Sequence, residues 1–96
     1  MILKDLTDPK AVRQAMTEYD QLGKDAFLAK YGYRKANKFF LIHAGKKYDS
    51  KAICGVAHGY QFGTPLRSNE FSGGAATVQK KLEQLGFKLS NGTGGK

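Results

Sequence analysis

Apolar residues recur at three- and four-residue intervals in four stretches of the chain, the spacing that places side chains on one face of an α-helix. Each stretch also carries a boundary signal, such as a capping side chain, a proline at the first helical position or a glycine after the last turn. The four predicted helices run from Asp8-Pro9 to Gly23, between Gly23 and Gly32, from about Ser50 to Tyr60, and from a Ser72 cap to Gly86.

The same spacing predicts which face of each helix is buried. These faces carry Val12, Ala15, Met16, Tyr19 and Leu22; then Phe27, Leu28 and Tyr31; then Ile53, Val56, Ala57 and Tyr60; and finally Ala75, Val78, Leu82 and Leu85. The first two helices are separated by a single glycine, so we expect a helical hairpin that serves as scaffold. Asp49 and Ser50 can each cap the third helix.

Two short β-forming runs lie between the second and third helices. Residues 39–43 (FFLIH) are followed by Ala44-Gly45 and by residues 46–48, a pattern that predicts a β-hairpin whose loop end displays His43, Lys46 and Lys47. Because a lone hairpin is weakly stable, we expect it to lie on the helices or to pair with a third strand at Phe87-Lys88-Leu89. The sequence therefore predicts an α+β, mostly α, single domain over residues 1–89, with a flexible tail or truncated linker at 90–96.

Positive charge is concentrated in the middle of the 96-residue chain. Sixteen Lys and Arg face eight Asp and Glu, which gives a net charge of +8. Residues 1–29 carry −1, residues 30–51 carry +6 with Asp49 as their sole acid, and the remainder carries +3. Such a patch favours a polyanionic partner, nucleic acid first, although plain solubility also explains a basic domain.

Catalytic and metal-binding patterns are missing from the sequence. The two histidines lie in no CxxC or HExxH spacing, the GxxxxGK[ST] pattern is not present, and no pair of acids suggests acid/base chemistry. Cys54 stands alone among apolar neighbours, so we interpret it as a core thiol in a reducing compartment. We expect no enzyme activity, cofactor, metal or membrane partner, and a cytoplasmic location because neither a signal peptide nor a membrane span is visible.

Candidate DNA contacts follow from charge and expected exposure. The cationic candidates are Arg34, Lys35, Lys38, Lys46, Lys47, Lys51 and Arg67. Ser72, Gly73 and Gly74 open the last helix, where uncovered N–H groups can face a phosphate, although the glycines can equally serve close packing. His58 falls off the apolar face of its helix, and with Thr77 it is a candidate for a more selective contact. Leu66 and Phe71 are expected to anchor the irregular turn that follows.

Residues 15–33 (AMTEYDQLGKDAFLAKYGY) and 40–87 together resemble the N-terminal head domain of McrA-like restriction endonucleases. The shared pattern is a strand ending in tyrosine, a KAI-x-G-x-AHG helix, an FSGG-x-x-T-V turn and a closing LGF. The matching positions are Tyr48, Lys51, Ala52, Ile53, Gly55, Ala57, His58, Gly59, Phe71, Ser72, Gly73, Gly74, Thr77, Val78, Leu85, Gly86 and Phe87.

The resemblance implies a DNA-binding accessory domain of a multidomain, HNH-type nuclease that cuts modified DNA. The 96 residues contain no HNH segment and no modified-base or sulfur-recognition module, so cleavage is not assigned to this chain. The expected partners are duplex DNA, with any preference for a modification left open, and a downstream nuclease domain in the same polypeptide. Two alternatives stay open: a docking module of the nuclease, and an RNA or single-strand binder that uses Tyr33, Phe39 and His43.

Overall fold

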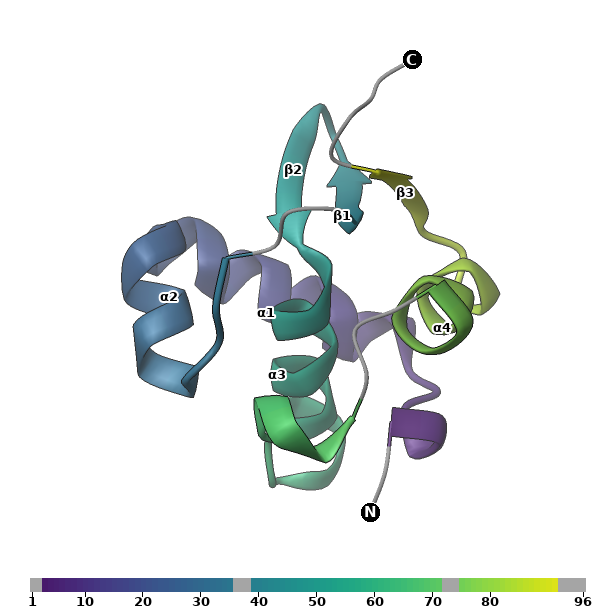
Figure 1. The fold of residues 1–96 in the computed structure, drawn as a ribbon, viewed down its shortest axis with the longest axis horizontal. Coiled ribbons are helices and arrows are strands. Elements are labelled where there is room, and N and C mark those ends of the chain that lie inside the picture. Colours follow the sequence, from purple (N-terminus) through teal and green to yellow (C-terminus); the bar gives the residue numbers. More distant parts are fainter. Residues whose placement is uncertain (1–2, 36–38, 72–74, 92–96) are drawn as a thin grey trace.

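Four helices and a small sheet make up most of the computed structural model, which describes residues 3–35, 39–71 and 75–91. The main elements are α1 (Pro9–Leu22), α2 (Lys24–Tyr31), β1 (Phe39–His43), β2 (Lys46–Asp49), α3 (Ser50–Phe62), α4 (Lys80–Gln84) and β3 (Lys88–Asn91). Short helical turns η1 (Leu3–Asp5), η2 (Ser68–Glu70) and η3 (Ala75–Gln79) connect them. In Figure 1 the strands stand above α1 and α3, with α2 to the left and α4 to the right. The predicted fold class, α+β and mostly α, is confirmed.

The helix boundaries follow local chemistry. The Asp8 side chain accepts a hydrogen bond from the backbone N–H of Lys10 (2.9 Å), and Pro9 occupies the first position of α1. Gly23, with φ 88°, ends α1 by donating to the carbonyl of Tyr19 (2.9 Å), and α2 begins at the next residue. The predicted helical hairpin is therefore confirmed.

The sheet has three antiparallel strands in the order β2-β1-β3, so the predicted third strand pairs with the hairpin. Ala44 and Gly45 both have positive φ (52° and 79°), the geometry of a two-residue hairpin turn. Leu41 is aligned with Tyr48 on one side and Leu89 on the other. Leu41 and Tyr48 are buried, which fixes this face of the sheet against the helices.

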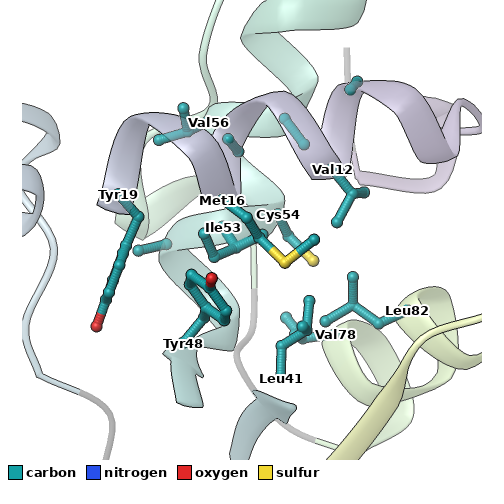
Figure 2. Close-up of a cluster of buried hydrophobic side chains, with 14 of the residues drawn as sticks. Val12, Met16, Tyr19, Leu41, Tyr48, Ile53, Cys54, Val56, Val78 and Leu82 are labelled. Atoms are coloured by element: carbon teal, nitrogen blue, oxygen red, sulfur yellow. The ribbon is translucent and has the colours of Figure 1, made fainter. Parts of the chain in front are cut away.

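The core lies where α1, α3, the sheet and the last helix meet (Figure 2). Val12 and Met16 of α1 point toward Leu41, Val78 and Leu82, with the side chains of α3 beside them. Cys54 is fully buried there, and burial raises the pKa of its thiol, in agreement with its interpretation as a core residue. The described helices include none that is long and apolar enough to cross a membrane.

Several local expectations are wrong. Leu22 and Tyr60 are each 42% exposed, because they lie in the last turns of α1 and α3, where the helices extend past the core. Asp49 precedes α3, but its carboxylate makes no capping bond and instead accepts from the Tyr19 hydroxyl (2.6 Å). The final helix begins with a π-helical segment, η3. Strand β3 reaches Asn91, while residues 92–96 lie outside the described residues, so the division into domain and tail stays a prediction.

Candidate nucleic-acid interface

One face of the sheet points away from the core and carries cations. Side chains alternate across a strand, so the burial of Leu41 and Tyr48 leaves their neighbours on the opposite face. The register aligns Ile42 with Lys47 on β2 and with Lys88 on β3. Phe40 and Ile42 are half-buried, while Lys47 and Lys88 are exposed. These four residues, Phe40, Ile42, Lys47 and Lys88, form the outer sheet face.

The positive charge of the outer sheet face is not neutralised by nearby acids. Asp49 is the sole acidic residue of the three strands, and it is 2% exposed with the Lys24 ammonium 3.6 Å from its carboxylate. Among the described residues, neither Lys47 nor Lys88 forms an ion pair. The ammonium groups of Lys24 and Lys47 lie 5.7 and 5.5 Å from the centroid of the Phe40 ring. Cations and an aromatic ring therefore share one surface.

The hairpin loop carries two further exposed side chains, which by alternation lie on the same side of the strands as Leu41 and Tyr48. His43 and Lys46 are exposed, as predicted. The Lys46 ammonium lies 3.5 Å from the Asp20 carboxylate, which also accepts from the buried Tyr48 hydroxyl (3.1 Å). Because both members of the Lys46–Asp20 pair are well exposed, water screens the pairing and leaves the ammonium available to a second anion.

Other predicted cations are distributed over two further segments. Arg34 and Lys35 are exposed in the connector after α2, and the Lys35 ammonium lies 3.9 Å from the exposed Asp25 carboxylate. Arg67 is exposed before η2, where its backbone N–H donates to Glu70 (2.6 Å). Of the remaining candidates, Thr77 is half-buried in η3, while Lys38, Ser72, Gly73 and Gly74 lie outside the described residues, so the expected helix entrance stays a prediction.

Lys51 differs from the other candidates because its ammonium already makes contacts inside the domain. It is half-buried, donates to the carbonyl of Ser68 (2.6 Å) and lies 5.2 Å from the centroid of the Phe71 ring. These contacts fasten the segment around η2 to α3. The predicted anchors Leu66 and Phe71 are confirmed as well, since Leu66 is 4% exposed and Phe71 packs against the core.

The expected exposure of His58 is wrong. Its side chain is fully buried beside the Phe62 ring, and Nδ1 lies 2.8 Å from the carbonyl oxygen of Thr64. A carbonyl can only accept, so Nδ1 carries the proton and donates. Nε2 has no hydrogen-bond partner within the described part of the chain. His58 therefore holds the turn after α3 and cannot touch a ligand without that turn opening.

The glycines of the KAI-x-G-x-AHG pattern have a packing role. A Cβ added at Gly55 would lie 1.8 Å from the Tyr33 hydroxyl oxygen, and one at Gly59 would lie 2.9 Å from Pro65. Tyr33 donates to the carbonyl of Leu66 (2.7 Å), whose N–H donates to the carbonyl of Gly55 (3.1 Å). The pattern thus lets the turn lie directly on α3. Because Tyr33 is 7% exposed, it cannot stack on a nucleic-acid base.

A polar cluster around Glu18 joins α1, α2 and α3, and it lines a surface hollow between these helices. The Glu18 carboxylate of α1 accepts from Lys30 (2.6 Å) and Tyr31 (2.7 Å) of α2 and from Tyr60 (2.7 Å) of α3. Burial alone raises the pKa of Glu18, but the hydrogen bonds from Lys30, Tyr60 and Tyr31 outweigh it, so the pKa lies below its ordinary value. The bond to Glu18 raises the pKa of Tyr60 to about 12.

Sequence reasoning missed Lys24 and Lys88 as members of the candidate surface. The sequence predicts Lys88 in a third strand, but the face of the sheet on which its side chain lies depends on its alignment with Ile42. Counting charges along the sequence gives no information about this alignment. Lys24 begins α2, far from the hairpin in sequence, and the fold brings it to Phe40. Alternation along 87–89, with Leu89 inward and Lys88 outward, was the available signal for Lys88. The described residues contain no cluster of three or more His, Cys, Asp or Glu placed to hold a metal ion.

The fold and this surface define a small α+β domain whose exposed sheet face carries cationic side chains. The chain belongs to the family of ScoMcrA-like N-terminal head domains, which matches residues 4–91. It is also similar to the solved structure of the type IV phosphorothioation-dependent restriction endonuclease ScoMcrA, with 30% identity and a TM-score of 0.62. That match covers 96% of this chain and 14% of the other. A comparison with curated proteins found no match.

Proposed function

We propose that this head domain of a ScoMcrA-like restriction endonuclease binds duplex DNA, and that it does so mainly through the phosphates. The outer sheet face supplies Lys47 and Lys88, the hairpin loop adds Lys46, and the connector adds Arg34 and Lys35. Lys51 and His58 are left out of this interface because their side chains are already engaged inside the domain. The predicted contacts at Lys38, Arg67, Ser72, Gly73, Gly74 and Thr77 stay part of the proposal.

The observation that carries the proposal is the alignment of Lys47 and Lys88 on either side of Ile42. Neighbouring strands lie about 4.8 Å apart, so the two lysines project from strands separated by roughly 10 Å. Their surroundings hold no exposed carboxylate on the sheet, since Asp49 is buried. A negatively charged backbone would be attracted to such a surface, and binding would release condensed counterions.

We propose that this domain adds affinity and leaves selection and cleavage to other parts of the polypeptide. Phosphate contacts position a protein on DNA but carry no base information. The similar endonuclease is phosphorothioation-dependent, and this chain spans 14% of it, which supports a nuclease domain elsewhere in the same cytoplasmic protein. Duplexes that differ only in backbone or base modification should therefore bind the isolated domain with equal affinity.

Mutation of the outer sheet face tests the proposal. In fluorescence anisotropy with a labelled duplex, Lys47→Ala/Lys88→Ala should bind about tenfold more weakly than wild type, a loss of about 1.4 kcal/mol. The matched control is Lys10→Ala/Arg13→Ala, which removes the same charge from exposed positions of α1. Equal losses of affinity in the two variants would show that only net charge matters. An unchanged affinity in Lys47→Ala/Lys88→Ala would exclude the outer sheet face as the binding surface.

A second candidate function is docking onto the remainder of the endonuclease. A hollow of about 480 Å³ lies between α1, α2 and α3, and its lining includes the exposed Leu22 and Tyr60. Exposed apolar side chains around a concave surface are typical of protein contacts. Isothermal titration calorimetry with the remaining domains of a ScoMcrA-like endonuclease should then show binding that Leu22→Asp weakens. An unchanged affinity in that variant would exclude this hollow.

A further inference from the structure

A separate basic hollow lies where the N-terminal turn η1 meets the last helix, formed by η3 and α4. Its volume is about 350 Å³. It is lined by Leu3, Lys4, Thr77, Lys80, Lys81 and Gln84. None of the three lysines belongs to the charged middle third of the chain, and none belongs to the outer sheet face. We refer to these six residues as the basic hollow.

The lining from the last helix follows one helical face. Residues 80, 81 and 84 have the α-helical spacing of one face, and Thr77 of the preceding π-helical segment η3 lines the same hollow. These four residues present a hydroxyl, two ammonium groups and an amide, each of which can donate a hydrogen bond. Lys4 adds a third ammonium from a segment more than seventy residues away in the sequence. Side chains that carry donors therefore line the hollow from both segments.

Lys81 holds the two sides of the basic hollow together. Its Nζ donates to the backbone carbonyl of Lys4 (3.1 Å), and its side chain is half-buried. Leu3, which is 3% exposed, supplies an apolar side chain to the lining. A charge beside such an apolar surface interacts more strongly with an anion than one in open solvent.

No acidic residue lines the basic hollow. Asp5 and Glu83 neighbour it in sequence but are not among its lining residues, and the Glu83 carboxylate accepts from the Gln79 amide (3.4 Å). Within the described residues, Lys4, Lys80 and Lys81 form no ion pair with a carboxylate. Three ammonium groups without a counter-charge favour an anion from outside the domain.

We propose that the basic hollow is a phosphate-binding site. The ammonium groups of Lys4 and Lys80 would neutralise the oxyanion, while Thr77 and Gln84 would donate hydrogen bonds to its remaining oxygens. The same chemistry fits a phosphodiester of a nucleic acid and a free phosphate group, because both present at least two unesterified oxygens. The site uses none of the residues of the outer sheet face, so it does not depend on DNA binding there.

An NMR titration with inorganic phosphate tests the site directly. Amide signals of Thr77, Lys80 and Gln84 should shift saturably with phosphate and should not shift with chloride at matched ionic strength. In Lys4→Ala/Lys80→Ala the phosphate concentration at half-saturation should rise at least tenfold; Lys81 is retained there because it ties the N-terminal turn to the helix. Equal shifts with chloride, or unchanged saturation in the variant, would overturn the proposal.

A second arm separates the two sources of phosphate. If the natural ligand is a nucleic-acid backbone, a short duplex should shift the same amides and compete with inorganic phosphate. If it is a free phosphate group, inorganic phosphate alone should shift them. Lys47→Ala/Lys88→Ala should leave the phosphate titration unchanged, so failure of the outer sheet face and failure of the basic hollow give different results. Shifts with neither probe would refute the site.

Discussion

At the scale of single residues, Gly55 shows how closely the turn after α3 approaches its helix. The space that a Cβ would need is occupied by the Tyr33 hydroxyl, which donates to the Leu66 carbonyl. Gly55→Ala must displace Tyr33 and break this bond, so we expect a loss of about 1–3 kcal/mol in the free energy of unfolding. Urea denaturation followed by circular dichroism measures it.

A second variant checks the cause of that loss. Removing the Tyr33 hydroxyl in Gly55→Ala/Tyr33→Phe takes away the atom nearest the new Cβ, so part of the stability should return relative to the sum of the two single variants. Strictly additive losses would show that a methyl group at position 55 does not collide with the Tyr33 hydroxyl as the structure describes.

Glu18 gives a pH-dependent prediction at the same scale. The pKa of Glu18 in the folded state lies below its ordinary value of 4.5. Between these two pKa values the unfolded state binds more protons than the folded state, so stability rises with pH. The contribution of Glu18 is fully present above about pH 4.5 and is lost as pH falls through the folded pKa. Glu18→Gln should lower the free energy of unfolding by about 1–3 kcal/mol at pH 7.

Denaturation measured from pH 7 to pH 3 distinguishes this role from a general effect of charge. Glu18→Gln should flatten the decline in stability at acid pH. The exposed Glu83→Gln is the matched control and should keep the decline of the wild type. Parallel pH profiles for wild type and Glu18→Gln would contradict the hydrogen-bonded cluster around this carboxylate.

At the scale of elements, the start of α1 depends on one capping bond. Asp8→Ala removes the acceptor for the Lys10 N–H, and we expect a loss of about 1 kcal/mol in the free energy of unfolding. Lys10→Ala is the control, because the bond uses the backbone of Lys10 and its side chain is exposed. A variant as stable as the wild type would show that solvent replaces the cap without cost.

Elements with strong local signals were predictable from the sequence, and those set by tertiary contacts were not. Asp8-Pro9 and Gly23 marked α1, and the run of β-forming residues FFLIH marked β1, because these signals act within a few residues. His58 lies off the apolar face by helical spacing, yet the turn at Thr64 folds over it and buries it. Periodicity within one helix contains no information about what a later loop covers.

At the scale of the whole molecule, charge counting predicted where cations concentrate in the chain but not which of them share one surface. The excess between residues 30 and 51 predicted a cationic surface, and Lys46 and Lys47 are exposed as expected. Lys51 carries the same charge but is held by Ser68, and Lys88 joins the surface only through the pairing of β3 with β1. Which cations face one side is a property of the register.

The dependence of duplex affinity on salt tests the central claim most directly. If the seven cations of the proposal each neutralise a phosphate, the logarithm of the association constant should fall by about 6 per decade of salt. These cations are Arg34, Lys35, Lys38, Lys46, Lys47, Arg67 and Lys88. Lys47→Ala/Lys88→Ala should reduce this slope by about two, and Lys10→Ala/Arg13→Ala should preserve it. A slope near zero for the wild type, or the same slope in all three proteins, would contradict a phosphate-binding outer sheet face.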